Sequence, residues 1–313
     1  MIYTGNKNQK MRKNRHELTK RQQSELSESE FIQPEQIVRF FHAVNPGDLI
    51  ASMGSMKSYY DRYCVSSKRK INICQSINQI AAYYQGATHP TVNETGQNVC
   101  CNIPMWEMLK PLVESQYYVN KFEQYNGQKI DVDLNIIRGK TPVNLPYGAI
   151  QTWVSLAYPD LQFDLTKEWI FVDDNCPKDI LKLVKGKVII NFTERYRNTM
   201  IDYNFLKHYA PDLIFAGTER EHWLFCNQWG LGSVPRLVVK DFLELAYAIK
   251  NCRFLLGNQS MNWNLAEAMK TPRLLEICTF APNCVHMVGD NSYGFLYQVG
   301  CEFWFRALYE KGL

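Results

Sequence analysis

The sequence of 313 residues lacks the features of several protein classes. No apolar run approaches the roughly 18 residues that a membrane-spanning helix needs, and the N-terminus has no apolar segment of the secretory type. The ten cysteines form no CxxC pair, which argues against a zinc ribbon or a thioredoxin-type site. We therefore expect a cytoplasmic protein without a transmembrane segment, whose cysteines are free thiols.

Several catalytic motifs are missing as well. The six histidines show neither an HxxxH nor an HxH pair, so the sequence predicts no zinc site. There is no Gly-x-Ser-x-Gly nucleophile elbow and no complete Walker or dinucleotide-binding fingerprint. The sequence therefore does not support a serine hydrolase, a P-loop enzyme or a standard dinucleotide-dependent enzyme.

The positive charge of the chain is concentrated at its N-terminus. The net charge is +4, and residues 1–23 carry seven basic side chains against one acid, so the rest of the chain is close to neutral. A basic polar arm of this kind can contact an anionic or a protein partner, or it can be a solvated terminus. We assign this arm to residues 1–30.

The rest of the chain has the composition of an ordinary globular protein that is long enough for two domains, with 46% hydrophobic and 21% charged residues. Apolar runs and helical periodicity predict alternating strands and helices in both halves. The expected strands are 36–43, 70–75, 118–125, 187–192, 212–216, 235–239, 254–256 and 274–277. The expected helices are 49–63, 104–115, 147–158, 203–209, 219–229, 241–251 and one after residue 260.

This alternation predicts an α/β fold with two Rossmann-like, doubly wound domains that face a cleft. We expect an N-terminal domain over 31–165 and a C-terminal domain over 166–296, with the linker within 161–187. Residues 297–313 are expected to form a helix that packs back across the domains.

Residues 252–278 are the most informative stretch. An apolar strand ends at Gly257-Asn258-Gln259-Ser260, which suits a turn and a helix N-cap, and Pro272 follows the helix. A strand–turn–helix unit of this kind directs backbone N–H groups and the positive end of a helix at one point, where a phosphate can bind. The alternative is a βαβ unit that only packs.

Two short segments resemble the ADP-heptose:lipopolysaccharide heptosyltransferase family, whose members are GT-B glycosyltransferases. Gly47-Asp48-Leu49-Ile50 is similar to the family's Gly-Asp-(Val/Ile)-Leu stretch, although Gly54-Ser55-Met56 stands where the family has a proline. In the family's C-terminal motif, Gln259 replaces an acid and Asn264 replaces a histidine. The matching positions of that motif are Gly257, Asn258, Ser260, Leu265, Ala266, Ala268 and Pro272.

The resemblance implies an inverting, metal-independent transfer from a nucleotide sugar to an unknown glycan or other acceptor, with no further cofactor. It implies that Asp48 is the general base, although Asp is also a favoured helix cap. It places the donor diphosphate at Arg195, Arg197, Asn258, Gln259 and Ser260. The remaining residues expected to line the cleft are Gly47, Gly217, Thr218, Glu219, Gly257 and Asn264.

Other interpretations remain open. Asp131-Val132-Asp133 has the DxD spacing that binds a metal in GT-A glycosyltransferases, although the surrounding pattern favours a strand with a solvated face. The substitutions at Gln259 and Asn264 are compatible with a fold that has lost catalysis and acts as a binding or assembly module through its basic arm. A third alternative is a glycosyltransferase that modifies nucleic acid, with the arm contacting phosphates.

Overall fold

The computed structural model describes residues 37–81, 91–135, 149–279 and 287–311. Within the chain, Ile37–Leu313 forms one compact unit, and the basic arm lies outside the described residues. None of the helices in the described part has both the length and the apolar character that a bilayer-spanning segment needs. The nine cysteines in these ranges are free thiols.

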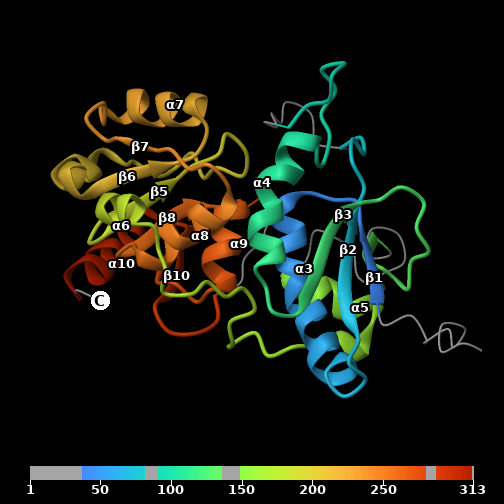
Figure 1. The fold of residues 1–313 in the computed structure, drawn as a ribbon. Helices are drawn as coiled ribbons and strands as arrows, with labels where there is room; N and C mark the ends of the chain where they lie inside the picture. The colour runs from blue at the N-terminus through green and yellow to red at the C-terminus, as the bar shows by residue number, and fades with distance from the viewer. Residues whose placement is uncertain (1–36, 82–90, 136–148, 280–286, 312–313) are drawn as a thin grey trace, which may run out of the picture. The chain divides into compact units, whose positions relative to one another are not determined.

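The first sheet consists of four parallel strands in the order β3–β2–β1–β4 (Figure 1). β1 (Ile37–His42) pairs along its full length with β2 (Lys70–Gln75), which pairs in turn with β3 (Val119–Gln124). β4 (Val132–Asp133) is a two-residue strand beside β1. The ranges expected for the first three strands differ from the observed ones by at most one residue at each end.

Helix α3 (Pro46–Tyr59) is buried on all sides, because apolar residues alternate with alanine, glycine and serine around its circumference. It begins three residues before the expected start, since Pro46 occupies the first turn and Asn45 and Asp48 form a capping box. A π-helical turn, Tyr60–Cys64, continues it. On the same sheet, α4 (Ile103–Glu114) begins at the N-cap Asn102.

The second sheet contains six parallel strands in the order β10–β9–β8–β5–β6–β7. The strands are β5 (Val188–Asn191), β6 (Leu213–Ala216), β7 (Arg236–Leu237), β8 (Phe254–Asn258), β9 (Arg273–Glu276) and β10 (Ser292–Phe295). Side chains alternate between two apolar clusters, one on each face of the sheet. Two parallel α/β sheets therefore confirm the expected fold class.

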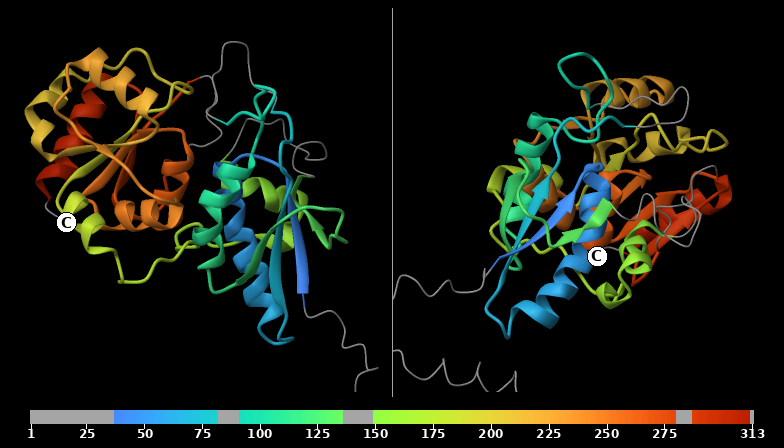
Figure 2. Two further views of the ribbon diagram at one scale, coloured as in Figure 1. Left: turned by 45° about the horizontal axis from the view of Figure 1, so that its top comes forward. Right: turned by 90° about the vertical axis from the view of Figure 1, so that its right-hand side faces the viewer.

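Helices cover both faces of the second sheet (Figures 1 and 2). α7 (Glu219–Trp229) and α10 (Gln298–Glu310) pack on the cluster that contains Phe215 and Phe254. α8 (Phe242–Asn251) and α9 (Met261–Ala268) pack on the other face, where they contact α4 and α3. The helices thus form the layer between the two parallel sheets.

Some elements differ from the expectation. β10 and α6 (Lys178–Val184) were not predicted, because the first is a short Ser-Tyr-Gly-Phe segment and the second a single short helix after Pro177. Residues Asn204–Asp212 form a 3-10 helix instead of the α-helix expected over 203–209. The helix expected over 147–158 is reduced to a 3-10 turn, Ile150–Thr152, and α5 (Trp153–Ala157).

The segment expected to hold the linker contributes to the core. The Trp169 backbone N–H donates to Ala268 O at 3.0 Å, and its indole Nε1 donates to Ile50 O at 2.8 Å. The hydroxyl of Tyr118 donates to Trp169 O at 2.7 Å. Trp169, which is 1% exposed, therefore connects α3 and α9 with Tyr118, the residue directly before β3.

A buried ion pair fixes the end of α9 against β9. Glu267 and Arg273 are both fully buried, with Arg273 Nε 2.6 Å from Glu267 Oε2, and Lys270 Nζ lies 2.5 Å from Glu267 Oε1. Arg273 also donates to the carbonyls of Thr271 and Val288, both at 2.8 Å. Burial lowers the pKa of Arg273, and the negative charge of Glu267 opposes this shift.

We predict that Glu267→Gln lowers the free energy of unfolding by about 3–5 kcal/mol, because it leaves the buried Arg273 guanidinium without its counter-charge. Urea denaturation followed by circular dichroism measures this loss. Glu168→Gln is the matched control, because its partner Lys250 is partly exposed and the loss of that pair should cost less than about 1 kcal/mol. Equal losses in the two variants would contradict the prediction.

Candidate functional site

A cavity of about 720 Å³ lies at the carboxyl ends of both sheets. Its walls come from the segments that follow β1, β5, β6, β7 and β8, together with side chains of α4, α8 and α9. Parallel α/β sheets bind ligands at this edge, because loops and helix N-termini converge there. This cavity is therefore the candidate functional site.

Eight of the twelve residues predicted from the sequence line this cavity. They are Gly47, Asp48, Arg195, Gly217, Thr218, Gln259, Ser260 and Asn264. The other four, Arg197, Glu219, Gly257 and Asn258, are not among its lining residues. The structure therefore brings together residues that are more than 200 positions apart in the sequence.

Asp48 lies in the third position of α3 and is 8% exposed. Its Oδ2 accepts hydrogen bonds from the Asn45 backbone N–H at 3.3 Å and from Asn45 Nδ2 at 3.4 Å. The carboxylate therefore caps its helix and at the same time borders the cavity. Asp48 thus combines a capping contact in α3 with a position in the cavity wall.

The N-termini of α3 and α9 meet at the cavity. A Cβ on Gly47 would lie 3.1 Å from Asn264 Nδ2 and 3.5 Å from the Cα of Met261. Asn264 Oδ1 in turn accepts a 3.1 Å hydrogen bond from Nε2 of the fully buried Gln151. Two positive helix ends consequently face one space, which favours an anionic ligand.

The turn after β8 is shorter than the sequence suggested. Gly257 and Asn258 belong to the strand, and the chain turns at Gln259 and Ser260. The Ser260 hydroxyl accepts from the Trp263 N–H at 3.2 Å and donates to Asn191 Oδ1 at 2.7 Å. Met261 and Asn262, whose N–H groups open the helix, both line the cavity.

Gly257 and Asn258 act on the cavity indirectly. A Cβ on Gly257 would lie 2.6 Å from Asn191 O, so glycine is required for the close approach of β8 and β5. The side chain of Asn258 accepts from the Thr193 N–H at 3.0 Å and donates to Arg195 O at 2.5 Å. Asn258 therefore holds the 193–196 segment in place, a role that the sequence did not reveal.

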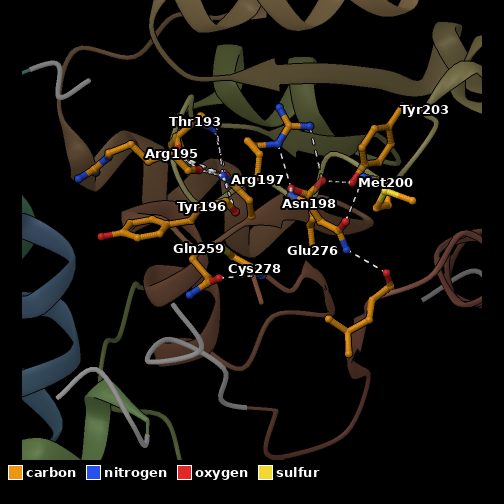
Figure 3. A network of polar contacts seen from close by, with 12 residues as sticks. Thr193, Arg195, Tyr196, Arg197, Asn198, Met200, Tyr203, Gln259, Glu276 and Cys278 are labelled. Atoms are coloured by element: carbon orange, nitrogen blue, oxygen red, sulfur yellow. Dashed lines mark hydrogen bonds and ion pairs between the residues drawn. The ribbon is translucent and has the colours of Figure 1, made fainter. Parts of the chain in front are cut away.

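Arg195 and Arg197 lie on the same segment but point apart (Figure 3). Arg195 borders the cavity, and its guanidinium lies 5.3 Å from the ring of Tyr196. Arg197 Nε contacts the fully buried Glu276 Oε1 at 2.9 Å, and its guanidinium lies over the ring of Phe192. Arg197 thus neutralises a buried carboxylate, which also accepts from the Tyr203 hydroxyl at 2.5 Å.

The rim of the cavity carries charges that the sequence prediction missed. Arg220 forms a two-point contact with Glu194 at 2.7 and 3.1 Å, and Arg236 at the start of β7 also lines the cavity. Glu221 lines it in place of Glu219, because the capping box of α7 uses Thr218 and Glu221. Burial raises the pKa of Glu221, partly offset by hydrogen bonds from Thr218. Arg236 is the first residue of β7 and falls inside the expected strand 235–239, so the rule that points to the segments after strands did not select it.

One part of the cavity wall is apolar. α4 contributes Met105 and Met108, and α8 contributes Phe242 and Leu245. Thr91, which precedes α4 in the chain, also lines the cavity. The polar part holds three acids and three arginines, so the lining has no net formal charge. A ligand with both an anionic and an apolar portion fits this division.

Both residues of the Asp131–Asp133 pair accept hydrogen bonds from the backbone. Asp131 Oδ2 accepts from the Arg39 N–H at 2.9 Å, and Asp133 Oδ1 accepts from the Asn135 N–H at 2.8 Å. Neither residue lines the cavity. Within the ranges that the structure describes, no group of three or more His, Cys, Asp or Glu side chains is arranged to hold a metal ion.

No protein-family model and no curated protein matches the sequence, whereas solved structures match the fold. The E. coli heptosyltransferase WaaC with ADP superimposes with a TM-score of 0.57 at 10% identity, covering 88% of this chain and 100% of WaaC. The E. coli ADP-heptose LPS heptosyltransferase II gives a TM-score of 0.52 at 12% identity, with 88% and 98% covered. A glycosyl transferase family 9 protein from Veillonella parvula gives 0.52 at 9%, with 88% and 90% covered. The resemblance to heptosyltransferases is thereby confirmed for the fold.

We predict that Gly257→Ala destabilises the protein by about 1–3 kcal/mol, because the added Cβ meets the backbone carbonyl of Asn191, which cannot rotate away. Gly300→Ala on α10 is the matched control. Its Cβ would meet only Phe295 Cβ at an ordinary 3.6 Å, and alanine stabilises a helix by up to about 1 kcal/mol relative to glycine. Thermal denaturation should therefore show a lower melting temperature for Gly257→Ala and a higher one for Gly300→Ala. A shift of both melting temperatures in the same direction would refute this account.

Proposed function

We propose that this protein is a glycosyltransferase that moves a sugar from a nucleotide-sugar donor to an acceptor hydroxyl, with inversion and without a metal. The observation that carries the proposal is that Asp48, Arg195 and the Gln259–Ser260 turn border one cavity at the carboxyl ends of two parallel sheets. The fold that it shares with heptosyltransferase structures, one of them solved with ADP, supports the same function.

The donor diphosphate would lie at the N-terminus of α9. Ser260 caps the Trp263 N–H, and the N–H groups of Met261 and Asn262 precede it at the start of the helix. Arg195 adds a full positive charge to the partial charge of the helix end. As the bond between the sugar and the diphosphate breaks, negative charge grows on the departing diphosphate, and these groups stabilise it.

Asp48 would accept the proton of the acceptor hydroxyl. The hydroxyl oxygen then forms a bond to the anomeric carbon as the bond from that carbon to the diphosphate oxygen breaks. Attack on the face opposite the departing group inverts the configuration at that carbon. Asp48 lies on α3 and the diphosphate groups on α9, so the two reaction partners would be held from different helices that meet at Gly47.

A catalytically inactive binding module remains the second candidate. Gln259 and Asn264 are neutral amides where the resembling family has an acid and a histidine, and both are engaged in internal hydrogen bonds. In that case nucleotides would bind without turnover, and the basic arm of residues 1–23 would provide the contact with an anionic or protein partner. Nucleic acid as the acceptor would require salt-dependent binding by the arm.

We predict that Asp48→Asn lowers the rate of sugar transfer, or of donor hydrolysis, by about 100-fold or more, because the amide cannot accept the proton. Binding of the nucleoside diphosphate, measured by calorimetry, should change little. Asp241→Asn is the control for capping, since Asp241 caps α8 and lies outside the cavity lining. Unchanged turnover in Asp48→Asn would exclude the base role.

We predict that Arg195→Ala weakens nucleoside diphosphate binding about tenfold or more, because a charge-assisted contact is lost. Arg197→Ala is its counterpart from the same segment, and it should mainly reduce stability by leaving the buried Glu276 carboxylate without its counter-charge. A thermal-shift and calorimetric screen of nucleoside diphosphates and nucleotide sugars provides both readouts. No binding of any of them at millimolar concentration would refute the enzyme proposal.

A further inference from the structure

Arg236 differs from the other two arginines that line the cavity. Arg220 is held by Glu194, and Arg195 lies over the ring of Tyr196. Arg236 is half-buried, and its guanidinium makes no hydrogen bond or ion pair with the residues that the structure describes. A guanidinium that is partly removed from water without a partner is available for a ligand in the cavity.

The position of Arg236 in the sheet fixes its distance from the diphosphate groups. Arg236 lies on β7, the edge strand, where it pairs with Phe215 of β6. The strand order places β6 and β5 between β7 and β8. Three strand spacings amount to about 14 Å. This span is comparable to an extended nucleoside diphosphate, so a diphosphate held at the N-terminus of α9 places its base near β7.

The surroundings of Arg236 also suit a base. Leu237, Val238 and Val239 follow it along the same wall of the cavity, and Val238 is 64% exposed. Apolar side chains at this end can cover the faces of a flat heterocycle, whereas the polar groups of Thr218 and Glu221 lie on the neighbouring segment after β6. Arg236 is the charged donor beside these apolar groups, whereas Arg220 on the segment after β6 is paired with Glu194.

A guanidinium carries only hydrogen-bond donors, so it pairs with ring carbonyls and not with amino groups. Guanine offers O6 and N7 as a pair of acceptors, and uracil offers O4, whereas adenine and cytosine carry an amino group at the corresponding position. Building on the proposed function, we propose that Arg236 selects a donor whose base carries a carbonyl at position 6 of a purine or position 4 of a pyrimidine, a guanosine or uridine diphosphate sugar.

Calorimetric titration of the full chain with GDP, ADP, UDP and CDP tests this inference, because each pair differs in the carbonyl or amino group. In the unmodified protein, we expect one of GDP or UDP to bind about tenfold or more tightly than its amino-bearing counterpart. Arg236→Ala should remove that preference by weakening the binding of the preferred nucleotide. Arg236→Gln, whose amide both donates and accepts hydrogen bonds, should reduce the difference in affinity between the paired nucleotides. Thermal denaturation checks that both variants fold.

The outcomes separate this inference from the proposed function. Binding of ADP or CDP as tight as that of GDP and UDP overturns the base selection and leaves the glycosyltransferase proposal intact. If Arg236→Ala weakens the binding of all four nucleotides equally, Arg236 contacts the diphosphate and the base selection is overturned. A base preference that survives the substitution overturns it as well. If none of the four binds the unmodified protein, the proposed function itself fails.

Discussion

The close approach of α3 and α9 is the contact on which the site depends. It is made without a side chain at Gly47, whose Cα faces Asn264 and the backbone of Met261. Trp169 bonds to the backbones of both helices, and Gln151 fixes Asn264 from the other side. If these helix ends were further apart, Asp48 and the Ser260 turn would belong to separate surfaces. The packing of the two helices therefore determines whether these groups can face one ligand.

The buried side chains on the α9 side of the site include two neutral amides, Gln259 and Asn264. Gln259 Oε1 accepts from the Cys278 N–H at 2.9 Å, a contact that a carboxylate could also make. Gln259 is only 2% exposed, however, and a charge at that depth would need a buried partner. The amide therefore preserves the turn without adding negative charge beside the proposed diphosphate site. The same reasoning applies to Asn264, which bonds to Gln151.

The sequence predicted the regular elements well because their signals are local. The N-cap Asp241 and the apolar core of α8, for example, lie within a few positions of each other. Contacts between distant segments carry no such signal. Nothing near Trp169 in the sequence indicates that it joins α3 to α9, and the expected linker is for that reason partly core. The same limit applies to β10, whose strand state depends on pairing with β9 more than on its own residues.

The two arginines of the 193–197 segment show the same limit at the level of the site. In sequence they are equivalent, since each is a basic residue in the segment after β5. The residue between them, Tyr196, has φ of 55°, a left-handed conformation that is uncommon outside glycine. This conformation sends Arg195 to the cavity and Arg197 to Glu276.

Such a conformation persists only where its surroundings fix it. Asn258 does so by donating to the carbonyl of Arg195 at 2.5 Å and to that of Tyr196 at 3.4 Å. The motif residue that the sequence assigned to the diphosphate thus shapes the segment that presents Arg195. Its contribution to an anion site is to hold the backbone, and the charge comes from a neighbour more than sixty residues earlier in the chain.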